Sequence, residues 1–316
     1  MQKIFVTGCA GFIGSHLCER LLQDENIEIF GIDNLNDYYD ISKKNKNLDI
    51  LKKYKNFIFE KDDLVTTTKI SEFKPNIVVN LGAMAGVRYS LDNPEIYSSI
   101  NTEGQTHLLN ECVKNKVKLY VYASSSSVYG TNTKIPFEET DSLDNMNSPY
   151  AVSKRSGELM AQLFSKLYDI QTIGLRFFTV YGPRGRPDMA PYKFLNAIMT
   201  ETKFDKYGDG SSMRDYTYID DIISGIIGAI KNKLNKKCEI YNLGNNTPIS
   251  LNEFIKTCEE ITGKNAQYIQ KNIQQGDVNI TCANIKKAKN DLDYNPRTSI
   301  IEGLKKTYDW IIQEKN

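Results

Sequence analysis

The segment Lys3–Gly14 reads Lys-Ile-Phe-Val-Thr-Gly-Cys-Ala-Gly-Phe-Ile-Gly, a short β-type run that leads into three glycines spaced three residues apart. The residues that follow, up to Gln23, have the apolar spacing of a helix. Glycine permits a tight turn and a close approach of the backbone to a ligand, and the free N–H groups of a helix N-terminus favour an anion such as a pyrophosphate. The segment predicts a strand–turn–helix unit that binds a dinucleotide, although its Gly-x-x-Gly-x-x-Gly spacing differs from the usual Gly-x-Gly-x-x-Gly.

Strand-like and helix-like segments continue to alternate through the first half of the chain. Further strand-like runs occupy residues 28–32, 57–60, 76–81, 117–123 and 172–178, and long helical patterns occupy residues 94–114 and 149–168. This alternation predicts the α/β class, with a Rossmann-like, doubly wound parallel sheet whose ligands bind beyond the carboxyl ends of the strands. From about Gly182 the elements become short, which predicts a smaller C-terminal substrate domain. We expect an NAD-binding domain at residues 1–180, with some later segments returning to it, and a mainly sugar-nucleotide-binding domain at residues 181–316.

Composition and charge exclude several classes of partner. The chain has 40 basic and 39 acidic residues and a net charge of +1 without a basic stripe, so nucleic acid is not an expected partner. No stretch approaches the roughly 20 apolar residues of a membrane span, and the N-terminal residues lack the pattern of a secretory leader. We therefore expect no membrane partner and a cytoplasmic location. The six cysteines form no Cys-x-x-Cys pair and there are only two histidines, so we expect no metal site.

Asp33 stands at the end of the second strand-like run, about 20 residues downstream of the glycines. At this place a carboxylate accepts hydrogen bonds from the ribose hydroxyls and repels a 2′-phosphate. Asp33 therefore favours NAD over NADP as the cofactor. The alternative interpretation is a turn or capping residue.

Tyr150 and Lys154 are four residues apart, which places both side chains on one face of a helix. A phenol is a poor base at neutral pH because its pKa is about 10, but a nearby ammonium group favours the phenolate. Tyr150 can then remove a hydroxyl proton while a hydride leaves the same carbon for NAD. Ser125, in the serine run that follows the strand at 117–123, is our candidate to bind the reacting oxygen. The alternative interpretation of Tyr150 and Lys154 is a pair on the protein surface, and the alternative for the serine run is a loop that caps a helix.

At this point the sequence resembles the extended short-chain dehydrogenases/reductases that act on nucleotide sugars, an NAD-dependent epimerase family. The resemblance covers almost the whole chain and rests on the turn at Gly8, Gly11 and Gly14, on Ser124–Gly130, on Tyr150 with Lys154, on Arg214–Asp221 and on Gly276–Val278. It implies a Rossmann-like domain followed by a sugar-nucleotide domain. It also implies a homodimer that forms through the two long helices at residues 94–114 and 149–168.

Two segments narrow the resemblance to UDP-glucuronate 4-epimerases. Asp33–Asp40 and Phe178–Ala190 look like the corresponding segments of those enzymes, and the second contains Arg184 and Arg186. Arginine's planar fork suits a sugar carboxylate. In the epimerases that this segment resembles, the position of Arg186 contacts the carboxylate. The alternative is a solvent-facing turn between two prolines.

The serine run separates the chain from two related classes. Related 4,6-dehydratases carry Thr-Asp-Glu before Val-Tyr-Gly, and UDP-glucuronate decarboxylases typically carry a Glu there, whereas this chain has Ser126 and Ser127 in those two places. Without an acid at this point, elimination of water lacks its proton donor. Asn80 and Asn284 also depart from the family, which commonly has His and Asp at these positions, and neither change removes a proposed catalytic group.

The resemblance carries over a set of site residues. The expected cofactor-binding residues are Gly8, Gly11, Phe12, Ile13, Gly14, Asp33, Asn34, Asp63, Leu64, Leu81, Tyr150 and Lys154. The expected substrate-binding residues are Arg88, Ser126, Ser127, Thr179, Arg186, Arg214 and Asp277. Arg214 and Asp277 match positions that contact the diphosphate and the nucleotide ribose, and Asn101 matches a residue that supports the active site.

The sequence thus predicts an NAD-dependent 4-epimerase of a UDP-sugar, which converts UDP-glucuronate to UDP-galacturonate through a transient 4-keto intermediate. Alternatives that stay open are a UDP-glucose or UDP-N-acetylglucosamine 4-epimerase, a UDP-glucuronate decarboxylase, a nucleotide-sugar 4,6-dehydratase and a non-catalytic sensor of NAD or a sugar nucleotide. The intact pair of Tyr150 and Lys154 argues against the sensor.

Overall fold

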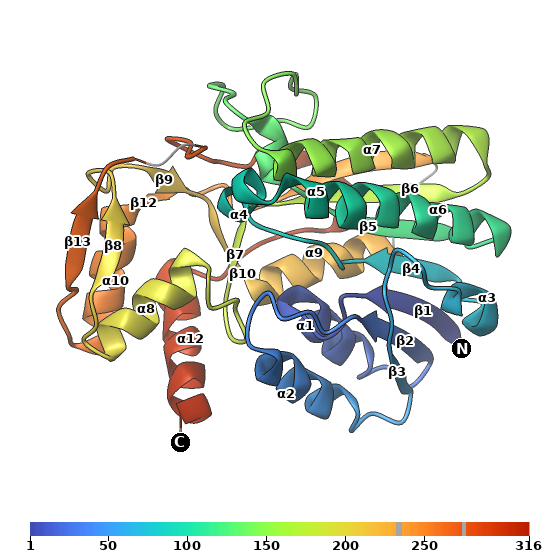
Figure 1. The fold of residues 1–316 in the computed structure, drawn as a ribbon, viewed down its shortest axis with the longest axis horizontal. Coiled ribbons are helices and arrows are strands. Elements are labelled where there is room, and N and C mark those ends of the chain that lie inside the picture. The colour runs from blue at the N-terminus through green and yellow to red at the C-terminus, as the bar shows by residue number, and fades with distance from the viewer. Residues whose placement is uncertain (232–235, 274–275, 316) are drawn as a thin grey trace.

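Among the residues that the structure describes, seven parallel strands form one sheet, and helices cover both of its faces (Figure 1). The structure is a computed structural model that describes residues 1–231, 236–273 and 276–315. The strands are, in spatial order, β11 (Cys238–Leu243), β6 (Gln171–Phe177), β5 (Leu119–Ser125), β4 (Ile77–Asn80), β1 (Gln2–Thr7), β2 (Ile27–Asp33) and β3 (Phe57–Lys61). This order reverses direction at β1, which confirms the predicted α/β class and doubly wound sheet.

Side chains along each strand alternate between the two faces of the sheet. Ile4 and Val6 of β1 belong to one buried apolar cluster, and Phe5 between them belongs to the other. The first cluster includes side chains of α1 (Phe12–Leu21), α2 (Ile41–Leu51) and α9 (Ile219–Lys231). The second includes side chains of α3 (Lys69–Phe73), α6 (Gly104–Lys114) and α7 (Pro149–Leu167). Each face of the sheet is therefore apolar and packs against its own layer of helices.

The long helix predicted at residues 94–114 has an irregular middle. It consists of α5 (Pro94–Tyr97), a π-helical turn (Ser98–Glu103) and α6. Single π turns recur at functional sites, and this one carries the buried Asn101. Its amide donates to Ser153 Oγ on α7 and to the backbone oxygen of Met84, both at 2.9 Å, and accepts from Met84 N–H at 2.8 Å. The turn thereby joins α7 to the loop after β4.

A smaller group of elements lies beyond the carboxyl ends of the sheet strands, on the left in Figure 1. Two parallel strands, β7 (Thr179–Tyr181) and β10 (Tyr216–Tyr218), lie between the sheet and this group (Figure 1). The group contains α8 (Ala190–Met199), α10 (Leu251–Thr262), α12 (Ile300–Lys315), the pair β8 (Phe204–Tyr207) and β13 (Tyr268–Lys271), and the pair β9 (Met213–Arg214) and β12 (Ile249–Ser250). The remaining elements are α4 (Val87–Asp92), a 3₁₀ turn (Ser126–Tyr129) and α11 (Lys286–Leu292). The division of the chain at residue 180 stays a prediction. Each helix of the described residues is too short or too polar to cross a bilayer.

Candidate active site

A cavity of about 380 Å³ opens at the carboxyl ends of β1, β2, β4, β5 and β6. Its walls bring together residues that are far apart in the chain. The expected residues that line it are Gly8, Gly11, Phe12, Ile13, Gly14, Asp33, Asn34, Leu64, Leu81, Ser125, Ser126, Ser127, Tyr150, Lys154, Thr179 and Arg186. Four expected residues, Asp63, Arg88, Arg214 and Asp277, do not line this cavity. The binding role of each of these residues stays a prediction.

The glycine turn leaves no room for side chains. Gly8 has a φ of +69°, and a Cβ atom on it would lie 2.7 Å from the backbone nitrogen of Gly82. A Cβ atom on Gly14 would collide with the backbone oxygen of Gly8. Gly11 caps α1 without a side-chain hydrogen bond, and the first turn of α1 contains no acidic residue. The first N–H groups of α1 are therefore available to an anion, so these residues fit the pyrophosphate of a dinucleotide.

Asp33 is buried at the end of β2, beside a lysine that the sequence analysis did not identify. Asp33 Oδ1 accepts from Leu35 N–H at 2.9 Å and lies 3.5 Å from Lys44 Nζ. Lys44 is buried as well and also donates to the side chain and backbone of Asn36, both at 3.1 Å. Asp33 Oδ2 has no hydrogen-bond partner among the described residues, so one carboxylate oxygen is left for a ribose. This arrangement fits the ribose end of NAD.

Asp63 acts on the cavity through Asn34. The Asn34 amide donates to Asp63 Oδ2 at 3.0 Å, while Asp63 Oδ1 accepts from Val65 N–H at 2.9 Å. Asn34 lines the cavity and Asp63 does not. Asp63 therefore orients a lining residue from behind, rather than facing the cavity itself.

Tyr150 and Lys154 lie one turn apart at the start of α7. The helix begins after Ser148, whose hydroxyl accepts from Ala151 N–H at 3.2 Å. Burial raises the pKa of Tyr150, while a hydrogen bond with Ser125 and the positive charge of Arg186 lower it. The three residues thus bring a phenol, a hydroxyl partner and a cation together, as a general base requires.

The side chain of Lys154 contacts β5, the strand that leads into the serine run. Its Nζ donates to the backbone oxygen of Ala123 at 2.9 Å and lies 6.0 Å from the centre of the Tyr150 ring. Burial lowers the pKa of Lys154 to about 8. The positive charge of Arg186 lowers the pKa of Tyr150, and the expected effect of Lys154 on the same phenol stays a prediction.

Arg184 and Arg186 point in different directions, although only Gly185 separates them. Arg186 lines the cavity, and its side chain is 17% exposed, so it does not lie in a solvent-facing turn. Arg184 instead pairs with Glu19 of α1 and donates to Ser15 Oγ at 3.4 Å. The expectation that Arg184 meets a sugar carboxylate is therefore wrong. Its φ of +60° and its partners on α1 direct the side chain away from the cavity.

Arg88, Arg214 and Asp277 come together outside this cavity, although they are far apart in the sequence. Arg88 Nη2 lies 3.1 Å from Asp277 Oδ2, and the Arg88 guanidinium lies over the ring of Tyr207 at 4.7 Å. Burial lowers the pKa of Arg214; the charge of Asp277 acts against this effect, and the charge of Arg88 adds to it. Two cations and one carboxylate therefore share one place, which suits the diphosphate end of a nucleotide.

Several residues that line the cavity were not predicted from the sequence. Tyr38 and Tyr39 lie in the segment Asp33–Asp40, and Lys44 lies in the first turns of α2. Met84 and Gly86 belong to the loop after β4. The position of the loop at a strand end was a usable signal for its residues, since such ends carry ligand sites. No local pattern distinguishes Lys44 from the other lysines of α2.

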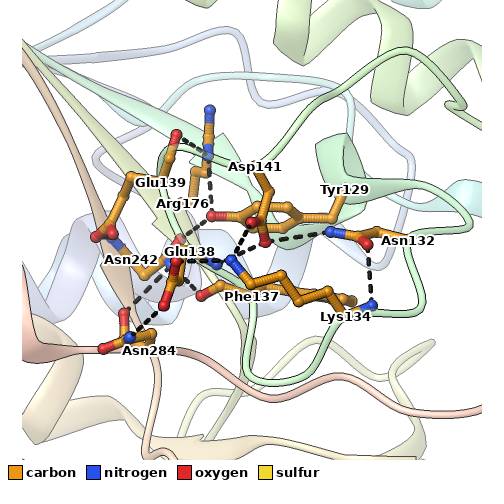
Figure 2. A network of polar contacts seen from close by, with 10 residues as sticks. All are labelled: Tyr129, Asn132, Lys134, Phe137, Glu138, Glu139, Asp141, Arg176, Asn242 and Asn284. Carbon is orange, nitrogen blue, oxygen red and sulfur yellow. Dashed lines mark hydrogen bonds and ion pairs between the residues drawn. The ribbon is translucent and has the colours of Figure 1, made fainter.

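A polar network anchors the segment that follows the serine run (Figure 2). Tyr129 OH donates to Asn242 Oδ1 at 2.7 Å and accepts from Arg176 Nη1 at 2.9 Å. Asn242 N–H donates to Glu139 Oε1 at 2.8 Å, and the amide of Asn284 reaches Glu138 at 3.2 Å. Because these contacts join residues 129–139 to β6 and β11, the serine run lies on a fixed support.

Comparisons with known proteins agree with this geometry. Residues 4–244 match the model of the NAD dependent epimerase/dehydratase family. The UDP-glucuronate 4-epimerase of Thermodesulfobacterium geofontis is 42% identical over 98% of this chain and 96% of that protein. The UDP-glucuronic acid 4-epimerase of Bacillus cereus, in complex with UDP-glucuronic acid and NAD, has a TM-score of 0.94 and is 35% identical over 99% of this chain and all of that chain. A UDP-glucose 4-epimerase of Thermotoga maritima has a TM-score of 0.90 and is 29% identical, with full coverage of both chains. These matches confirm the resemblance drawn from the sequence and the expected cofactor NAD, and the chain belongs to the NAD dependent epimerase/dehydratase family.

Proposed function

We propose that this protein is a UDP-sugar 4-epimerase that interconverts UDP-glucuronate and UDP-galacturonate. The observation that carries the choice of a uronate is the position of Arg186. Its largely buried guanidinium lines the same cavity as Tyr150, Ser126 and Ser127. Asp188 pairs with one edge of this guanidinium and leaves Nη1 without a partner among the described residues. The remaining fork of an arginine matches a carboxylate, which a uronate supplies and a neutral sugar does not.

The proposed chemistry begins with proton removal by Tyr150. Its phenolate takes the proton of the C4 hydroxyl, and Ser125 hydrogen-bonds the same oxygen. Bound NAD supplies a hydride acceptor beside C4 and a hydride donor for the return step. The 4-keto sugar turns over between the two steps, so that the opposite face of C4 receives the hydride. The Lys154 ammonium group donates a hydrogen bond to the backbone oxygen of Ala123. In this position it keeps a positive charge near the hydroxyl groups of Tyr150 and Ser125.

The sugar carboxylate requires restraint, because a 4-keto uronate is a β-keto acid that loses CO₂ readily. Ser126, Ser127 and Arg186 form the proposed clamp that holds the carboxylate out of the orientation for this loss. The clamp contains hydroxyls and a guanidinium but no carboxylic acid, so it lacks a proton donor for elimination. Thr179, at the start of β7, faces the same cavity.

At the other end of the substrate, Arg88, Arg214 and Asp277 form the proposed site for the UDP group. Two guanidinium groups suit the diphosphate, and the carboxylate suits the ribose hydroxyls. The pair of Arg88 and Asp277 joins α4 to the segment after β13. Nucleotide contacts by these residues would hold the sugar end in the cavity.

The proposed homodimer uses the outer face of α7. Val152, Leu159, Leu163 and Leu167 are exposed there, at helical spacing. α6 lies beside α7 on the same face of the sheet (Figure 1). Four large apolar side chains on one helix face favour burial against a second copy of the same surface.

The test is incubation of the purified protein with UDP-glucuronate without added NAD, followed by NMR of the anomeric protons. UDP-galacturonate without a pentose product is the expected result. A UDP-pentose product would identify a decarboxylase and contradict the clamp. No conversion, also after addition of NAD, combined with turnover of UDP-glucose, would identify a neutral-sugar epimerase.

A further inference from the structure

Arg186 is held on three sides by other residues. Its Nε donates to Asp188 Oδ1 at 3.0 Å, and its Nη2 donates to Asp188 Oδ2 at 2.5 Å. The guanidinium lies over the ring of Tyr38 at 5.3 Å, and Tyr38 OH donates to Asp188 Oδ2 at 3.4 Å. Gly86 packs close by, since a Cβ atom there would lie 3.8 Å from Arg186 Nη2. Three residues therefore fix the plane and the direction of one guanidinium.

Asp188 occupies only one edge of this guanidinium. The edge formed by Nε and Nη2 is paired, whereas Nη1 makes no hydrogen bond or ion pair with any residue that the structure describes. A guanidinium presents a second fork, formed by Nη1 and Nη2, that matches a carboxylate in two parallel hydrogen bonds. One carboxylate can thus orient the arginine while a second carboxylate binds to it.

Asp188 and Arg186 differ in their relation to the cavity. Arg186 lines the cavity and Asp188 does not. The side chain of Asp188 is 39% exposed, against 17% for Arg186. Asp188 therefore pairs with Arg186 without lining the cavity, and this pairing leaves Nη1 without a partner among the described residues.

We propose that Asp188 is a positioning residue that determines specificity for uronates, because with Tyr38 it fixes Arg186 so that the free fork faces the sugar carboxylate. The proposal rests on the proposed function and extends it to two residues outside the clamp. Without Asp188, the guanidinium keeps its charge but loses its fixed direction. The enzyme should then bind the uronate less well and restrain its carboxylate less strictly.

The experiment compares Asp188→Ala and Asp188→Asn with the parent and with Asp309→Ala, which removes an exposed aspartate from α12. For Asp188→Ala we expect the Kd and KM of UDP-glucuronate to rise about tenfold, the effect of a lost hydrogen bond to a charged group. The Kd of UDP-glucose, which has no carboxylate, should be unchanged. Asp188→Asn retains one acceptor oxygen and should fall between the parent and the alanine variant.

Two further readouts separate positioning from a general structural effect. The 4-keto intermediate of a poorly held uronate breaks its C5–C6 bond, releases CO₂ and takes up a proton at C5, which gives a UDP-4-keto-pentose. Return to C4 of the hydride removed in the first step gives UDP-pentose, so the ratio of these two pentose products to UDP-galacturonate should rise. In the background of Arg186→Ala, the second change Asp188→Ala should have no added effect on the Kd of UDP-glucuronate, because Asp188 acts only through Arg186.

Three outcomes would overturn the proposal. A lower KM for UDP-glucuronate in Asp188→Ala would mean that Asp188 competes with substrate. An unchanged Kd, in a parent protein that prefers the uronate to UDP-glucose, would remove the role of Asp188 and leave the proposed function intact. A parent protein that binds UDP-glucuronate no better than UDP-glucose would overturn both proposals.

Discussion

Glu158 of α7 and Arg176 of β6 form a buried ion pair next to the end of β5, the strand that contains Ser124 and Ser125. Arg176 Nε lies 2.8 Å from Glu158 Oε1, and the two side chains are 1% and 0% exposed. Ser124 Oγ donates to the same carboxylate oxygen at 2.6 Å. The helix that carries Tyr150 and Lys154 is thereby tied to the strand that carries Ser125, so the pair sets the relative position of the two halves of the proposed catalytic group.

Glu158→Gln should destabilise the protein strongly. It leaves the Arg176 charge buried without its partner, which typically costs about 3–5 kcal/mol. Burial alone would raise the pKa of Glu158, but Arg176 and Ser124 outweigh it and lower that pKa. The contribution of the pair is therefore present at neutral pH and is lost on acidification through the lowered pKa.

Urea unfolding at neutral and acidic pH measures this difference. Asp169→Asn is the matched control, because the pair of Asp169 with Lys237 is exposed and exposed pairs contribute about 0–1 kcal/mol. A loss of stability in Glu158→Gln no larger than that in the control would contradict the prediction.

Arg186→Met should shift the acid limb of the kcat–pH profile to higher pH. The positive charge of Arg186 lowers the pKa of Tyr150, so its removal raises that pKa and a smaller fraction of the phenol is ionised at a given pH. Arg184→Met is the control, since Arg184 pairs with Glu19 outside the cavity. The same acid limb in both variants would show that Arg186 does not act on Tyr150.

Lys154 should cause kcat to decline on the alkaline side of the kcat–pH profile. Burial lowers the pKa of Lys154 to about 8, so its positive charge is lost as the pH rises through that value and activity should decline. Lys154→Arg keeps its charge at this pH, and its residual activity should persist to higher pH. Measurement of kcat from neutral to alkaline pH in the parent and in Lys154→Arg tests this prediction. The same alkaline decline in both proteins would mean that a group other than Lys154 causes it.

Asp33→Asn should relax the preference for NAD over NADP. The buried carboxylate repels a 2′-phosphate, and the amide does not. We expect the ratio of the Kd values of NADP and NAD to fall by about tenfold or more, the effect of one charge-assisted contact. Titration of the two cofactors measures the ratio. Asp62→Asn, a change in another cavity-lining carboxylate, should leave the ratio unaltered, and an equal fall in both variants would refute a specific role of Asp33.

Leu159→Glu together with Leu163→Glu should convert the proposed dimer to a monomer. Both residues are exposed on α7, and two buried carboxylates in each protomer would oppose burial of that face. Sedimentation equilibrium reports the change. Ile301→Glu, on the exposed side of α12, is the control. A parent protein that sediments as a monomer, or a double variant that remains a dimer, would exclude α7 as the interface.

Local sequence rules were sufficient for the sheet and for the cofactor turn. The backbone at Gly8 and Gly14 has no room for a Cβ atom, so only glycine fits, and the requirement is visible in the sequence. The inner strands β1, β2, β4, β5 and β6 are apolar runs that are largely buried, and they begin and end within a few residues of the predicted bounds. The long helix at residues 94–114 was predicted without its π turn, because the helical spacing on either side hides one extra residue.

The direction of side chains in irregular segments could not be predicted in this way. Arg184 and Arg186 have the same chemistry and nearly the same position, yet a positive φ and a partner 165 residues away on α1 separate their roles. The pair of Arg88 and Asp277 spans 189 residues. No periodic pattern encodes such contacts.

The sequence by itself therefore determined the fold class, the glycine turn, the helix that presents Tyr150 and Lys154, and the family, because each depends on local spacing or on a backbone that accepts only one residue type. The tertiary structure alone decided which arginine lines the cavity and that Asp188 pairs with it. These features depend on contacts between segments that only the folded chain brings together, where burial makes one neighbouring charge decisive.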